Sequence, residues 1–161
     1  MRLHALKQPK DQQGMALVEF TIALPLLLLL LLALGEFGRM LFQYNTLLQA
    51  SRDAGRYVAS QAWNSTLGAV DLTTNTTLVT QTKNVAVYGV PANTGTPVVS
   101  GLTTGNVAVA AVGTDHVRVT ITYTFCPVIG AGACTGSITG LFANTIALSI
   151  PLVATTVMRV L

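Results

Sequence analysis

An acidic residue, Glu19, lies a few positions inside an otherwise apolar segment, shortly after Gly14. An ionisable group in a membrane span costs on the order of a few kcal/mol, so it indicates a functional site. If the chain is cut after Gly14, Met15 becomes the new N-terminus, with an α-amino group that is largely protonated near neutral pH. The Glu19 carboxylate would then pair with the amino terminus of a neighbouring subunit and select one axial register. The alternative is a carboxylate at the membrane interface, stabilised there by the dipole at the helix start.

A second pair of reactive residues consists of Cys126 and Cys134, the only cysteines in the chain. Outside the cytoplasm such a pair most often forms a disulfide, which for so short a ring contributes roughly 2.5 kcal/mol at best. Free thiols and metal or redox chemistry are the alternatives. No histidine lies close in sequence and the spacing is not C-x-x-C, so we expect no metal site and no cofactor.

Residues with catalytic potential are few. Outside residues 1–14 the single histidine is His116, which follows Asp115 at the start of a predicted strand. Neighbouring residues on a strand point to opposite faces, so we expect no dyad between these two side chains. No nucleophile elbow, phosphate loop or paired carboxylates appear, which predicts no enzyme and no small-molecule substrate. The net charge of +3 forms no basic stripe interleaved with aromatic residues, so we expect no nucleic-acid partner either.

The elements that must position these residues begin with an apolar run of twenty residues, 15–34. At roughly 1.5 Å per helical residue it extends about 30 Å, the thickness of a hydrocarbon core, which predicts one pass through membrane lipid. Arg2, Lys7 and Lys10 precede the run, so the positive-inside rule places the N-terminus in the cytoplasm and the C-terminal part outside it. A secretory signal peptide cut after Gly35 is a competing interpretation.

The helix is predicted to continue beyond the span, over residues 15–63. Apolar and small residues recur there at alternating spacings of three and four, which places them on one helical face: Leu34, Phe37, Leu41, Tyr44, Leu48, Ser51, Gly55, Val58 and Ala62. We expect the second half of this face to pack on the chain's own globular part, the alternative being partner subunits. Pro25 removes the amide that would bond to the Thr21 carbonyl, so it is predicted to loosen the helix. Neighbouring groups in the membrane could instead satisfy that carbonyl.

Residues 64–161 are predicted to form a threonine-rich β domain outside the cytoplasm. Apolar residues alternate with polar ones from Val117 to Phe125, a pattern typical of a half-buried strand. Shorter strands are predicted at 85–88 and 107–109, and a last one within 144–160, where Pro151 must lie at an edge or bulge. Residues 73–82 and 91–106 are predicted surface loops. The fold class is therefore α+β, with a long N-terminal helix packed on a small antiparallel sheet.

Four stretches of this sequence together resemble the TadE-like family. They are 14–20 with Glu19-Phe20, Leu24-Pro25-Leu26, Gly35-Glu36-Phe37-Gly38-Arg39, and Ala50 to Ala59 with Arg52, Gly55, Arg56 and Tyr57. TadE-like proteins are pseudopilins or minor pilins of the tight-adherence (Flp) pilus, a type IV-like system. The resemblance spans residues 14–59.

The resemblance implies a bacterial inner-membrane protein with a pilin-like fold and a leader peptide, residues 1–14, that a prepilin peptidase removes between Gly14 and Met15. It also implies other Flp-type pilins, minor pilins and the assembly platform as partners. Two other classes remain open. One is an uncleaved, signal-anchored protein for binding or adhesion, and the other is a secreted protein cut after Gly35.

Overall fold

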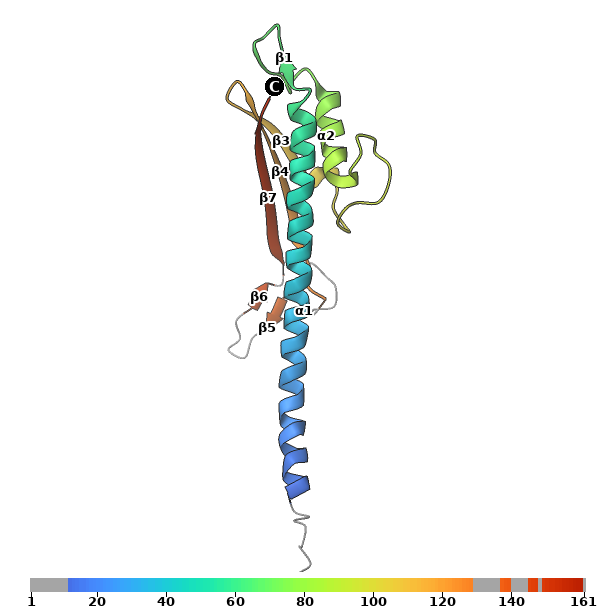
Figure 1. The fold of residues 1–161 in the computed structure, drawn as a ribbon, viewed down its shortest axis with the longest axis vertical. Coiled ribbons are helices and arrows are strands. Elements are labelled where there is room, and N and C mark those ends of the chain that lie inside the picture. The colour runs from blue at the N-terminus through green and yellow to red at the C-terminus, as the bar shows by residue number, and fades with distance from the viewer. Residues whose placement is uncertain (1–11, 129–136, 140–144, 148, 161) are drawn as a thin grey trace, which may run out of the picture. The chain divides into compact units, whose positions relative to one another are not determined.

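The computed structural model describes residues 12–128, 137–139, 145–147 and 149–160 (Figure 1). The chain divides into two compact units, residues 1–38 and 39–161. The first element is the helix α1 (Gln12–Ala59), 48 residues long, which confirms the long helix expected from the sequence. It ends at Ala59 instead of near Trp63, because Trp63 pairs with Val70 in a short hairpin of the strands β1 (Trp63–Asn64) and β2 (Ala69–Val70).

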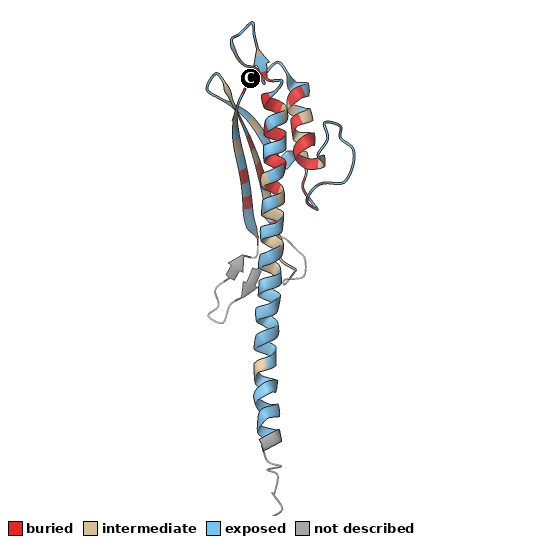
Figure 2. Ribbon diagram, viewed as in Figure 1, coloured by how far each residue is buried: buried red, intermediate tan, exposed pale blue. Residues whose placement is uncertain are grey.

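Within the first unit, α1 exposes nearly every side chain from Gly14 to Gly38 (Figure 2). In the described part of the chain, this is the one helix long and apolar enough to cross a membrane, and its most apolar stretch has no buried residue. An apolar surface of this length must be covered by lipid or by other helices. The helix therefore fits a single-pass membrane anchor.

The second unit is organised around an antiparallel sheet of three strands, in the order β3 (Val107–Val112), β4 (His116–Phe125) and β7 (Ile150–Arg159). The strand predicted from the alternation of residues 117–125 is β4, and the ones predicted at 107–109 and within 144–160 are β3 and β7. Pro151 lies on β7, an edge strand in which a missing amide is tolerated, as expected. The strands β5 (Ser137–Thr139) and β6 (Thr145–Ala147) form a separate hairpin.

A second helix, α2 (Thr76–Tyr88), corrects two sequence-based predictions, the loop at 73–82 and the strand at 85–88. The Asn75 side chain accepts a hydrogen bond from the Leu78 amide and caps the helix, and Gly89 ends it with a φ of 75°. The helix buries side chains at helical spacing: Leu78, Thr82, Val85 and Ala86. Burial of this face outweighs the β propensity of its threonines and valines. In the predicted loop 91–106, the last residues form a 3-10 turn, η1 (Thr104–Asn106).

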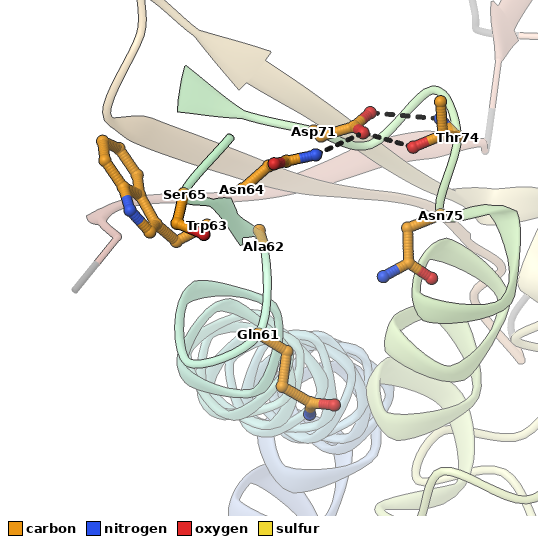
Figure 3. A pocket seen from close by; sticks show the side chains of 8 residues that line it. All are labelled: Gln61, Ala62, Trp63, Asn64, Ser65, Asp71, Thr74 and Asn75. Carbon is orange, nitrogen blue, oxygen red and sulfur yellow. Dashed lines mark hydrogen bonds between the residues drawn. The ribbon is translucent and has the colours of Figure 1, made fainter. Parts of the chain in front are cut away.

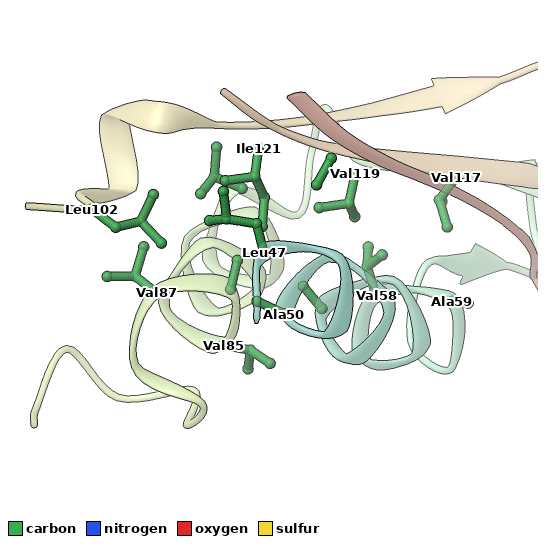
Figure 4. Packing of buried hydrophobic residues seen from close by; sticks show 14 of the residues in the cluster. Leu47, Ala50, Val58, Ala59, Val85, Val87, Leu102, Val117, Val119 and Ile121 are labelled. Carbon is green, nitrogen blue, oxygen red and sulfur yellow. The ribbon is translucent and has the colours of Figure 1, made fainter. Parts of the chain in front are cut away.

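The core of the second unit lies between α1, α2 and one face of the sheet (Figure 4). From α1 it takes Leu47 and Val58, and from β4 the alternate residues Val117, Val119 and Ile121, all fully buried. The second half of the predicted apolar face of α1 therefore packs against the chain's own core, as expected. The residues of its first half, Leu34, Phe37 and Leu41, are exposed.

Candidate functional site

The predicted processing site lies at the beginning of α1. Gly14 and Met15 are exposed, and the side chain of Met15 is 77% accessible. The bond between them is part of the helix, which begins at Gln12. A peptidase that cuts here must unwind the first turn of α1, in which Gly14 and Met15 are both exposed.

Glu19 is exposed on α1 among large apolar side chains, with Phe20 and Ile22 next to it at 60% and 73% accessibility. Among the residues that the structure describes, none forms an ion pair or hydrogen bond with the Glu19 carboxylate. The described chain thus presents an uncompensated carboxylate on a surface made for an apolar environment. Such a group requires a cation or hydrogen-bond donor from outside the described chain.

Pro25 lies within α1, which continues through it as a helix. The Thr21 hydroxyl, one turn earlier, donates a hydrogen bond of 2.7 Å to the carbonyl oxygen of Leu17. A hydroxyl bonded back to the preceding turn is common in helices and slightly favours bending. The loosening of this turn remains a prediction.

The segment 35–39 lies at the boundary between the two units, with Gly35 and Gly38 in the first and Arg39 in the second. A Cβ added at either glycine would meet no atom within 4 Å, so neither glycine serves a close contact within the chain. Phe37 is 55% exposed, and Glu36 is half-exposed.

Arg39 on α1 contacts residues at the end of β4. Its Nη2 donates a hydrogen bond of 2.7 Å to the carbonyl oxygen of Cys126, and its Cζ lies 4.7 Å from the centroid of the Phe125 ring. A guanidinium over an aromatic face adds a cation–π attraction of about 0.5–2 kcal/mol. Arg39 therefore has a structural role in the second unit, where it holds α1 against the end of β4.

The segment 50–59 of α1 packs against β7 through small residues. A Cβ at Gly55 would lie 3.3 Å from Sδ of Met158 and 3.5 Å from Cγ2 of Thr156, so the glycine allows the helix to approach the strand. One turn earlier, the Ser51 hydroxyl forms a hydrogen bond of 2.8 Å with that of Thr156. These contacts give Gly55 a packing role.

The other residues singled out in this segment point elsewhere. The Tyr57 hydroxyl donates a hydrogen bond of 2.9 Å to Oε1 of Gln81 and connects α1 with α2. Arg52 and Arg56 are exposed, and Arg56 forms a weak ion pair of 3.8 Å with Asp53, as its spacing of three residues predicted. In the described part of the chain, both arginines therefore lie on the surface of α1.

The predicted disulfide involves Cys134, which lies outside the described residues. Cys126 directly follows β4 and is half-exposed. The bridge between the two cysteines stays a prediction.

The structure corrects the expectation that Asp115 and His116 do not interact. Nδ1 of His116 lies 2.7 Å from Oδ1 of Asp115, because Asp115 belongs to the turn before β4, where the alternation of a strand does not apply. An ionised carboxylate only accepts hydrogen bonds, so the Nδ1–H of the imidazole donates this one. In the described part of the chain, no group of three or more His, Cys, Asp or Glu residues is placed to hold a metal ion.

A further polar cluster, which the sequence analysis missed, borders a surface hollow of about 230 Å³ between β1 and the start of α2 (Figure 3). The Asp71 carboxylate accepts hydrogen bonds from the amides and hydroxyls of Thr73 and Thr74 and from Nδ2 of Asn64. These bonds, that from the Thr74 hydroxyl above all, hold the pKa of Asp71 well below its usual value. The D-x-T-T sequence is a signal for such a turn, and its role is to fix the chain before α2.

These features define a class: an α+β protein with one exposed apolar helix, fit to anchor it in a membrane, that leads into a small helix-and-sheet unit. Residues 14–56 match the family described as TadE-like protein, which confirms the resemblance found in the sequence. No curated protein and no solved structure matches the chain, so the predicted likeness to pilins in fold remains a prediction. The match supports a pilus-associated protein of the tight-adherence system, and the TadE-like family is not known for enzymes.

Proposed function

We propose that this chain is a minor pilin or pseudopilin that takes part in priming, capping or building a tight-adherence pilus. A prepilin peptidase removes residues 1–14, and the product begins at Met15. The N-terminus lies in the cytoplasm of a bacterium, α1 crosses the inner membrane, and the second unit lies outside the cytoplasm. The TadE-like match over residues 14–56 and the exposed apolar helix support this assignment.

The observation that carries the proposal is the carboxylate of Glu19 on that apolar helix, which no described residue compensates. Glu19 lies four positions after Met15, which is a rise of about 6 Å along a helix. An axial shift of this size between two neighbouring helices brings the new amino terminus of one to the carboxylate of the other. In an apolar environment this pair offsets the desolvation of both charges and disfavours every other register.

Pro25 and the exposed arginines of α1 have secondary roles in the proposal. The missing amide at Pro25 weakens the helix after Glu19 and eases the movement of a subunit from the bilayer into a helical bundle. Arg52 and Arg56 lie on the exposed side of α1 and face other pilins or the assembly platform. Phe37, together with Gly35 and Gly38, belongs to the part of α1 that the chain itself leaves uncovered.

The experiment replaces Glu19 by glutamine in a host that assembles the pilus. The variant leaves the amino terminus of the neighbour as an unpaired charge, and breaking a buried pair in this way costs about 3–5 kcal/mol. We expect the amount of this subunit in sheared filaments to fall by about tenfold or more, measured by immunoblot beside a filament count.

Asp53→Asn is the matched control, because it removes an exposed carboxylate from the same helix outside the apolar segment. We expect normal filaments from this control. Normal filament number and normal subunit content with Glu19→Gln would contradict the role of the carboxylate.

A further inference from the structure

The only tryptophan of the chain, Trp63, is 44% exposed on the short strand β1. Its indole ring points away from Asp71 and Asn75, on the far side of the hollow shown in Figure 3. Trp63 also lines a second hollow, of about 340 Å³, together with Asp115, Arg159 and Val160. The exposed part of an indole ring contributes nothing to the stability of the fold. A flat apolar ring beside polar groups is, however, a common surface for binding a ligand.

The polar groups of this second hollow are held in place and keep unused bonding capacity. Oδ1 of Asp115 accepts the hydrogen bond from His116, and its Oδ2 lies 3.4 Å from Nε of Arg159. A carboxylate offers about four acceptor positions, so Asp115 keeps about two of them with respect to the described residues. Among the described residues, none forms a hydrogen bond or ion pair with the two terminal nitrogens of Arg159, whose side chain is 73% exposed. Donors and acceptors therefore lie side by side next to an indole.

We propose that this hollow binds a pyranose sugar. The apolar C–H face of the ring stacks on Trp63, while neighbouring hydroxyl groups donate to the Asp115 carboxylate and accept from the Arg159 guanidinium. The charges of Asp115 and Arg159 compensate each other, which favours a neutral ligand rich in hydroxyl groups over an ion. The volume is at the small end of ligand pockets and suits one or two sugar rings.

The lining of the hollow favours a sugar over a protein surface. The centre of a protein–protein interface is depleted of charged residues, and a charged pair at such a site must be desolvated at a cost. A sugar instead replaces the water of that pair with its own hydroxyl groups. The inference is independent of the role in pilus assembly, since none of these residues lies in the segment matched by the family.

The single tryptophan makes the test direct, because its fluorescence reports on Trp63 alone. The full chain in detergent micelles is titrated with glucose, N-acetylglucosamine and their β-1,4-linked disaccharides, and with sorbitol as an open-chain polyol. We expect a saturable change in emission with at least one of the ring sugars and none with sorbitol. The absence of a saturable change with every ring sugar would overturn the proposal.

Variants separate this site from nonspecific binding. We expect Arg159→Ala and Asp115→Asn to weaken sugar binding by about tenfold, the effect of losing one charge-assisted hydrogen bond. Arg118→Ala is the matched control, because Arg118 is exposed on β4 but does not line the hollow, and its affinity should equal that of the native chain. Circular dichroism melting verifies that each variant is folded. Equal affinity in folded Arg159→Ala, or an emission change with a pilus protein and with none of the sugars, would also overturn the proposal.

Discussion

At Gly55, α1 lies so close to β7 that an added Cβ would meet Sδ of Met158 at 3.3 Å. A leucine there must displace Met158 and Thr156, and overpacking of this kind costs about 1–3 kcal/mol. We predict that Gly55→Leu lowers the free energy of unfolding of the second unit by that amount, as measured by thermal or urea denaturation. Gly38→Leu is the control, because a Cβ at Gly38 meets no atom within 4 Å, and it should melt no lower than the native chain. Equal stability of the two variants would contradict the packing role of Gly55.

Asp71 makes stability depend on pH in acid. Its pKa in the folded chain is lowered from 3.8, chiefly by the hydrogen bond from the Thr74 hydroxyl. A carboxyl with a depressed folded pKa contributes its full stabilisation above its unfolded pKa and loses it as the pH falls through the folded value. We predict that the melting temperature falls more steeply below pH 3.8 in the native chain than in Asp71→Asn. Asp53→Asn serves as the control and should keep the native slope, whereas the same slope in Asp71→Asn would refute the prediction.

At the residue scale the sequence indicates some site residues and conceals others. Glu19 stands out as the one charge in a long apolar run, and Gly14 stands out through the resemblance to the TadE-like family; the roles of both residues stay predictions. The contact of Arg39 with Cys126 joins residues that are 87 positions apart, and no local pattern encodes it. The contact between Asp115 and His116 was not predicted, because both residues were treated as part of the strand, whereas β4 begins at His116 and Asp115 lies in the turn before it.

At the scale of elements, the attachment of α2 to α1 involves the hydrogen bond from Tyr57 to Gln81. Tyr57→Phe removes the donor and keeps the ring, and such a bond contributes about 0.5–1.5 kcal/mol. We predict a loss of stability in this range, measured by chemical denaturation. Tyr44→Phe is the matched control on the same helix, since none of the described residues forms a hydrogen bond with the Tyr44 hydroxyl, and it should have no effect. A native stability of Tyr57→Phe would show that the contact is not formed.

The predictability of the elements follows their periodicity. The strand β4 and the helix α1 were recognisable because each keeps one period over many residues, two in β4 and 3.6 in α1. α2 was missed since its threonines and valines favour strands, while its helical signals, Asn75 before it and Gly89 after it, are single residues. Tertiary burial decides its structure, and burial is not visible in a short window of sequence.

At the scale of the whole molecule, the two units have different needs. The second unit contains its own core between α1, α2 and one face of the sheet. In the first unit, the described residues 14–38 are mostly apolar and exposed, and among them the Glu19 carboxylate has no ion pair or hydrogen bond with another described residue. In the proposed function, a lipid bilayer covers the apolar surface, and the amino terminus of a neighbouring subunit pairs with the carboxylate. The second requirement presupposes that the chain has been cut after Gly14.

The intact mass of the mature chain, purified from a host that carries a prepilin peptidase, is the most direct test of that condition. Our account predicts a single species that begins at Met15. A chain that still begins at Met1 would indicate an uncleaved anchored protein, and one that begins at Glu36 would indicate a secreted protein. Either result would contradict the account, because Glu19 would then have no nearby chain terminus to pair with.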